Sequence, residues 1–147
     1  MKVWITLLAL AAFPAYGQIQ IENPWSRATP AGTKIAAGYL VVKNTSATPD
    51  RLLSATSPAA ERVETHVHIR EGEIMRMREV KGYDIPASGS FELKPGGAHL
   101  MFMNIRAPFR EGDRIPVVLR FQRAGEVKIE FAVGNKPPAK AESHHTH

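Results

Sequence analysis

The sequence predicts an all-β protein, folded as an antiparallel sandwich or Greek-key barrel of about eight or nine strands. From Gln18 onwards the apolar residues alternate in short runs, which is the two-residue period of strands. Turn formers are frequent, with 11 Gly and 11 Pro in 147 residues, and no long helical pattern separates them. An α+β domain remains the alternative, because residues 57–62 could form a short helical turn.

The apolar runs place nine strands along the chain, and Gly, Pro, Asn or Ser residues mark the turns between them. Residues 18–133 are expected to form one domain, since the length suits a single core. From residue 134 to residue 147 the composition turns polar and Pro-containing, which predicts a flexible tail. The expected strands cover residues 19–22, 37–43, 51–55, 62–69, 73–80, 90–93, 99–105, 117–122 and 127–133.

Residues 1–17 have the pattern of a cleaved secretory signal peptide. Lys2 precedes an almost wholly apolar run that ends at Phe13, and Ala15-Tyr16-Gly17 places small residues where a signal peptidase cuts. The run is too short to anchor a protein in a bilayer, and no later segment is apolar enough to cross one. We therefore expect a periplasmic protein without a membrane span. A buried N-terminal helix is the alternative.

Composition excludes several function classes. The chain contains no cysteine, which rules out disulfides, thiolate metal sites, iron–sulfur clusters, blue copper centres, cysteine nucleophiles and the lipid attachment of a lipoprotein. The formal charge of +5 would suggest nucleic acid as a partner, but export removes that option. Any metal must be held by His, Met or carboxylate side chains.

Methionine and histidine gather in one part of the sequence. Every Met after the first lies between residues 75 and 103, and three of the six His lie between residues 66 and 99, so the two types share the stretch 66–103. Strand alternation places these side chains on the face opposite the best apolar residues. The candidates in this stretch are His66, His68, Met75, Met77, His99, Met101 and Met103.

Two of the expected strands form a hairpin that brings His and Met together. With a two-residue loop at residues 71–72, His68 faces Met75 and His66 faces Met77. Directly opposed residues have Cβ atoms about 5 Å apart, close enough to share an ion. The sequence permits the strand at residues 99–105 to converge on this pair, but does not show that it does.

Ligand chemistry indicates the metal. Thioether sulfur is soft and imidazole is borderline, so a mixed set of two His and two Met suits Cu(I). Zinc prefers His, carboxylate and thiolate, and calcium and magnesium prefer oxygen. Such a site would bind Cu(I) and release it to an acceptor, which is how a carrier works.

The spacing His66-x10-Met77-x21-His99-x-Met101 resembles the signature of the periplasmic copper chaperones of the PCuAC type. Flanking segments resemble that family too, among them residues 24–28, 37–40, 63–66, 75–78 and 93–101, and the similarity extends to Val133. The resemblance implies a cupredoxin-like Greek-key β-sandwich. It also implies Cu(I) bound by the four motif residues and copper delivery to the CuA site of cytochrome c oxidase, directly or through a Sco-type partner. His68, Met75 and Met103 lie outside the motif, as candidates for a supporting or exchange role.

The sequence ends in a His-rich segment, in which His144, His145 and His147 could bind Cu(II) or Zn(II). An unselected polar end is the alternative. We expect a monomer. We also expect no catalytic activity, because nothing beside Glu64, Glu73 and Glu79 resembles a nucleophile or a substrate pocket.

Three other functions stay open. A copper buffer would have the same site without a dedicated acceptor. A zinc hydrolase would use His66, His68 and either Glu64 or Glu73, and Met77 would be dispensable. A β-sandwich adhesion or assembly module would carry its methionines incidentally and bind no Cu(I) tightly.

Overall fold

The structure, a computed structural model, describes residues 18–138, and it contains ten strands and no α-helix within that range. The predicted all-β class is confirmed, with one strand more than the sequence indicates. The signal-peptide segment and most of the tail lie outside the described residues. The strands are β1 (Ile19–Ser26), β2 (Ile35–Asn44), β3 (Asp50–Thr56), β4 (Ala60–Glu71), β5 (Ile74–Glu79), β6 (Tyr83–Ile85), β7 (Gly89–Leu93), β8 (His99–Ile105), β9 (Arg114–Phe121) and β10 (Gly125–Val133).

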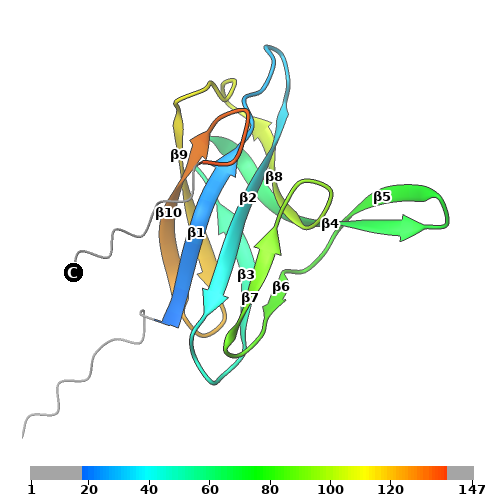
Figure 1. The fold of residues 1–147 in the computed structure, drawn as a ribbon. Coiled ribbons are helices and arrows are strands. Elements are labelled where there is room, and N and C mark those ends of the chain that lie inside the picture. Colours follow the sequence, from blue (N-terminus) through cyan, green and yellow to red (C-terminus); the bar gives the residue numbers. More distant parts are fainter. Residues whose placement is uncertain (1–17, 139–147) are drawn as a thin grey trace, which may run out of the picture.

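The strands wrap into a flattened, closed sheet. Hydrogen-bonded neighbours follow the order β4-β8-β2-β1-β10-β9-β3, and β3 pairs again with β4 through Ala55 and Val63. β5 is added at the outer side of β4, β6 pairs with β3, and β7 pairs with β2. Most pairs are antiparallel, and β1 runs parallel to β10. The β4–β5 hairpin extends well beyond this body (Figure 1).

The core fills the space between the two layers with inward-facing aliphatic and aromatic side chains. Phe102 of β8 packs edge-on against Phe109 and Phe131, with ring centroids 5.3 Å and 5.7 Å away. Gly38 on β2 permits this packing, because a Cβ there would lie 2.9 Å from atoms of both Phe102 and Phe131. Leu100 and Phe102 are fully buried, which fixes the orientation of β8 and turns its odd-numbered residues to the opposite face.

The β4–β5 hairpin has a different register from the predicted one. Glu71 pairs with Ile74, so the two-residue loop is residues 72–73 and not residues 71–72. The reason is the backbone: Gly72 has φ +63°, and the first loop position of both common hairpin turns requires positive φ. The predicted loop would have forced the side-chain-bearing Glu71 into that conformation.

The corrected register shifts the cross-strand pairs by two residues and leaves the faces unchanged. His68 lies opposite Met77, His66 opposite Glu79, and Met75 opposite Arg70. The predicted pairs of His66 with Met77 and of His68 with Met75 are therefore wrong, although all four side chains share one face.

Within residues 18–138, no helix is both long enough and apolar enough to cross a membrane.

Candidate metal centre

The direct pairing of β4 with β8 brings the two halves of the motif together. His66 lies directly opposite His99 in this pair, and their ring centroids are 5.5 Å apart. The ring of His68 lies 5.2 Å from that of His99. A metal ion about 2 Å from an imidazole nitrogen lies about 3 Å from the ring centre, so one ion can bind nitrogens of two rings at these separations.

His99 is held with one nitrogen toward Met77. Its Nδ1 lies 3.1 Å from the carbonyl oxygen of Gly97, and its Nε2 lies 3.1 Å from Sδ of Met77. The carbonyl can only accept, so Nδ1 carries the proton and the lone pair of Nε2 faces the sulfur. The contact therefore brings a nitrogen and a sulfur that can both bind a soft metal next to each other.

Burial keeps this imidazole neutral. His99 is 3% exposed, and loss of water lowers the pKa of its ring below the ordinary 6.5. The hydrogen bond to Gly97 opposes that shift, and positive charge on His68 or His66 would lower the pKa further. A neutral imidazole is the form that binds a metal.

His66 is oriented by a carboxylate. Its Nε2 lies 2.8 Å from Oε2 of Glu64, whose Oε1 accepts a hydrogen bond from Nε of Arg62 at 2.7 Å. The hydrogen bond from Arg62, and after it the one from His66, lower the pKa of the Glu64 carboxyl, so Glu64 is charged and accepts the Nε2 proton. Nδ1 of His66 is then a bare lone pair, buried and without a hydrogen-bond partner. Buried nitrogens are rarely left unpaired, and a metal ion is one explanation.

The backbone of both histidines is fixed by one phenol. The hydroxyl of Tyr83 lies 2.6 Å from the carbonyl oxygen of His66 and 2.8 Å from that of His99. The two carbonyls share its single proton, and burial raises the pKa of Tyr83 above its ordinary value of 10.0. Next to it, Thr65 accepts a hydrogen bond from the backbone N–H of Gly82, so the segment after β5 is fastened to β4 at the site.

The remaining methionines lie along the same face at different depths. Met101 is two residues from His99 on β8, opposite Glu64 and 7% exposed. Met103 lies two residues further, opposite Arg62. Met75 is exposed near the hairpin tip. The structure thus brings His66, His68, His99 and Met77 together, places Met101 beside them, and leaves Met75 and Met103 at the two ends of the row.

Alternation along the strand assigned these residues to the correct face, but it did not show that His99 and Met101 are buried there. It also missed the groups that orient the histidines. On the sequence alone, Glu64 has a role only in the zinc alternative. Its position two residues before His66 on the same strand face does, however, predict that its carboxylate can contact the His66 ring. Tyr83 sits on the three-residue strand β6, which is too short to show alternation, so no sequence signal pointed to it.

The zinc alternative finds no support in this part of the chain. Among residues 18–138 there is no group of three or more His, Cys, Asp or Glu side chains placed to hold one metal ion. The donors that converge are imidazole and thioether. The tail residues His144, His145 and His147 lie outside the described range.

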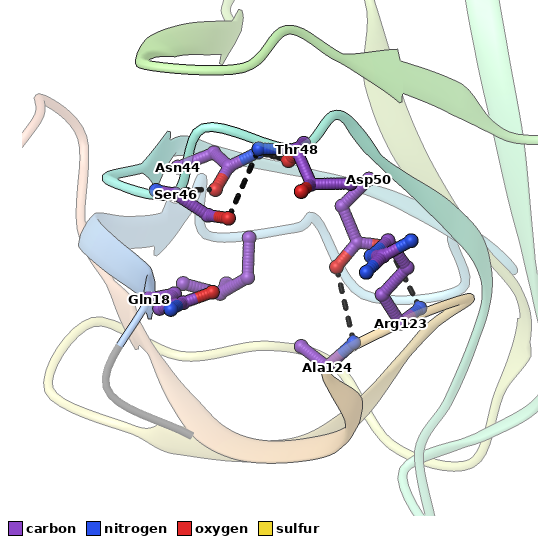
Figure 2. A pocket seen from close by; sticks show the side chains of 8 residues that line it. Gln18, Asn44, Ser46, Thr48, Asp50, Arg123 and Ala124 are labelled. Carbon is purple, nitrogen blue, oxygen red and sulfur yellow. Dashed lines mark hydrogen bonds between the residues drawn. The ribbon is translucent and has the colours of Figure 1, made fainter. Parts of the chain in front are cut away.

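A separate small cavity of about 100 Å³ lies near the end of β2 and contains none of the candidate ligands (Figure 2). Its most buried charge is Asp50, whose carboxylate accepts hydrogen bonds from the backbone N–H groups of Arg51, Arg123 and Ala124 at 2.7, 2.9 and 3.1 Å. These bonds connect the start of β3 to the β9–β10 turn. The cavity is therefore accounted for by loop structure.

Comparison with known proteins agrees with this geometry. Residues 19–133 match a family model described as "Putative lipoprotein LpqE-like". A "Putative lipoprotein" of Leifsonia xyli subsp. xyli is 36% identical over 104 residues, which is 70% of this chain and 61% of that protein. The chain therefore spans less than two thirds of that relative.

Solved structures of PCuAC domains share the fold. The copper-bound PCuAC domain from PmoF2 is 30% identical, with a TM-score of 0.70 over 82% of this chain and 95% of that one. The apo PCuAC domain from PmoF1 is 26% identical, with a TM-score of 0.69 over 82% and 96%. The solution structure of DR1885 with Cu(I), from Deinococcus radiodurans, is 22% identical, with a TM-score of 0.66 over 88% and 84%, and shows the cupredoxin-like fold.

These relatives are described as lipoproteins and metal-binding domains, not as enzymes, in agreement with the expectation of a non-catalytic protein. The match over residues 19–133 and the shared cupredoxin-like fold show that the chain belongs to the LpqE-like family, which is the PCuAC type.

Proposed function

We propose that this protein is an exported Cu(I) carrier that binds one ion through His66, Met77, His99 and Met101. The observation that carries the proposal is the approach of Nε2 of His99 to Sδ of Met77, which lie 3.1 Å apart. The buried, unpaired Nδ1 of His66 supplies a third donor beside them. Two neutral nitrogens and two neutral sulfurs suit Cu(I) and leave the bound ion's charge unchanged.

Similarity to a copper-bound domain supports copper as the metal. The PmoF2 domain is described as copper-bound, and at 30% identity over most of both chains it is a close enough relative to suggest the same cargo. The family descriptions name lipoproteins, a class of exported proteins, which supports a location in the cell envelope. Within this proposal the protein resides in the periplasm after cleavage of residues 1–17.

Release requires an acceptor that binds Cu(I) more tightly. We place the CuA domain of cytochrome c oxidase in that role, reached directly or through a Sco-type protein, as the motif implies. The tail residues His144, His145 and His147 would bind Cu(II) separately, because imidazoles without thioether suit the oxidised ion.

A Cu(I) competition titration under anaerobic conditions tests the proposal. The full chain would carry His144→Gln, His145→Gln and His147→Gln, so that only the domain site is measured. We expect one tightly bound Cu(I) per chain, and at least about a hundredfold weaker binding when Met77→Leu and Met101→Leu are combined, since each lost donor costs on the order of 1.4 kcal/mol or more. Equal binding by both proteins, or none by either, would contradict the proposal.

Transfer separates a carrier from a buffer. The loaded protein would be mixed with the apo form of a CuA domain, and copper in each protein would be measured after separation. Stoichiometric transfer supports a carrier, and retention of Cu(I) by the loaded protein would favour the buffer.

A further inference from the structure

Met77 and Met75 on β5 are far more exposed than His99 and Met101 on β8. His99 and Met101 are 3% and 7% exposed, whereas Met77 is 45% and Met75 is 54% exposed. All four lie on one face of the β5-β4-β8 sheet. The most exposed donors therefore lie on the β4–β5 hairpin, which projects from the body (Figure 1).

The exposed end holds a second group of soft donors. Met77 lies opposite His68, and Met75 lies two residues further along β5 on the same face, about 7 Å from Met77 by the strand repeat. The ring of His68 lies 5.2 Å from that of His99, so His68 borders both the buried and the exposed donors. Met77 is thus shared between the buried donors and the outer ones.

Packing gives no reason for a thioether at position 75. All six residues of β5 are exposed, and β5 is the outermost strand, with β4 as its only partner in the sheet order. The cross-strand neighbour of Met75 is the charged Arg70, not an apolar side chain. A methionine usually fills a gap in a core, and this one has no core to fill.

We propose that Met75, His68 and Met77 form an outer Cu(I) position, through which the ion passes between the buried donors and the acceptor. This inference rests on the proposed Cu(I) carrier function. During the passage Sδ of Met77 stays bound, bonds from Cu(I) to His68 and to Sδ of Met75 form, and the bonds to His66, His99 and Sδ of Met101 break. Copper stays in the +1 state, and because a thioether has no proton to lose, neither a proton nor an electron moves.

The buried donors and the outer donors therefore affect different quantities, the equilibrium affinity for Cu(I) and the rate of its transfer. The buried set determines how tightly Cu(I) is held at equilibrium, since those donors are shielded from water. The outer set lowers the barrier to exchange, because the ion gains a new bond before the last buried bond is lost. Met75 therefore matters for the rate of transfer and little for the equilibrium affinity.

Stopped-flow transfer to bathocuproine disulfonate, a coloured Cu(I) chelator, tests this difference between affinity and rate. The protein is the full chain with the three tail histidines replaced by Gln, loaded anaerobically with one Cu(I). Met75→Leu keeps the size of the side chain and removes the sulfur. Met103→Leu is the matched control, since Met103 lies on the same face at the other end of the row, opposite Arg62.

We expect Met75→Leu to slow transfer by about tenfold, which corresponds to losing about 1.4 kcal/mol of transition-state stabilisation. Its equilibrium affinity should stay within about threefold of the parent, and Met103→Leu should change neither quantity by more than about twofold, as surface substitutions away from a site do. His68→Gln should slow transfer as well.

Two results would overturn the inference. Transfer by Met75→Leu at the parent rate would show that the outer sulfur takes no part. A loss of affinity as large as that of Met77→Leu would make Met75 a resident ligand. Failure of the proposed Cu(I) carrier function is distinguishable from failure of this inference, because in that case the parent protein itself would bind no Cu(I).

Discussion

The clearest single test of how the site is organised is the removal of the Glu64 carboxylate. Glu64 accepts the Nε2 proton of His66 at 2.8 Å and is itself held by Arg62 at 2.7 Å. In the proposed site this arrangement leaves Nδ1 of His66, which is buried without a hydrogen-bond partner, as the nitrogen that would bind the metal. Without Glu64 the ring can rotate or change tautomer, so the ligand is no longer preorganised.

The structure allows an estimate of the loss. Partners that orient a ligand histidine typically contribute 10- to 100-fold in metal affinity, so Glu64→Ala should weaken Cu(I) binding by roughly 1.4–2.7 kcal/mol. Glu64→Gln keeps an acceptor oxygen for His66 but loses the charge, and it should fall between the parent and the alanine variant. Apoprotein stability should change by no more than about 1 kcal/mol, because the Arg62 end of this network is half exposed.

Anaerobic Cu(I) competition measures the affinity, and urea unfolding of the apoprotein measures the stability. Glu61→Ala is the control, since Glu61 is an exposed acid on the same strand whose carboxylate accepts a hydrogen bond from Asn104 at 2.6 Å, away from the histidines. If copper instead binds Nε2 of His66, it must displace Glu64, and Glu64→Ala would then bind Cu(I) as tightly as the parent or more tightly. That result would refute the reasoning.

Three further outcomes are expected. Gly38→Ala should lower the free energy of unfolding by about 1–3 kcal/mol in urea, because its Cβ would lie 2.9 Å from ring atoms of Phe102 and Phe131; unchanged stability would contradict the packing. Tyr83→Phe should lower the free energy of unfolding by about 1–3 kcal/mol in the same assay, because the carbonyls of His66 and His99 lose the hydroxyl that they share. The same substitution should also weaken Cu(I) binding. The lowered pKa of His99 means that the unfolded chain binds more protons than the folded one near and below pH 6.5. The free energy of unfolding of the apoprotein should therefore decrease as the pH is lowered through this range, and it should decrease less steeply in His99→Gln. A free energy of unfolding that increases as the pH is lowered would contradict the shift.

Local rules predicted much of the fold. Alternation of apolar residues located nine of the ten strands and assigned the candidate ligands to the correct face, because a buried Leu100 and Phe102 leave no other orientation for β8. The missing strand, β6, has three residues and cannot show a period. Its existence depends on pairing with β3, which is a long-range contact.

The site was harder to predict because its geometry depends on which strands pair. The predicted pairing of β4 with β5 was wrong by two residues, because the positive φ of Gly72 decides the loop position and a conformational angle is not visible in strand alternation. The pairing of β4 with β8, which sets His66 opposite His99, could not be read from their separation in the sequence. The burial of His99 and its contact with Met77 follow from that pairing and were not predicted.

X-ray absorption at the copper edge of the Cu(I)-loaded protein tests the central claim most directly. The protein would again carry the three tail substitutions, so that the signal comes from the domain. The proposed function predicts a four-coordinate Cu(I) spectrum with two sulfur neighbours and two imidazole nitrogen neighbours. Met77→Leu should remove one sulfur. A parent spectrum with nitrogen and oxygen neighbours only would contradict a site built from His66, Met77, His99 and Met101.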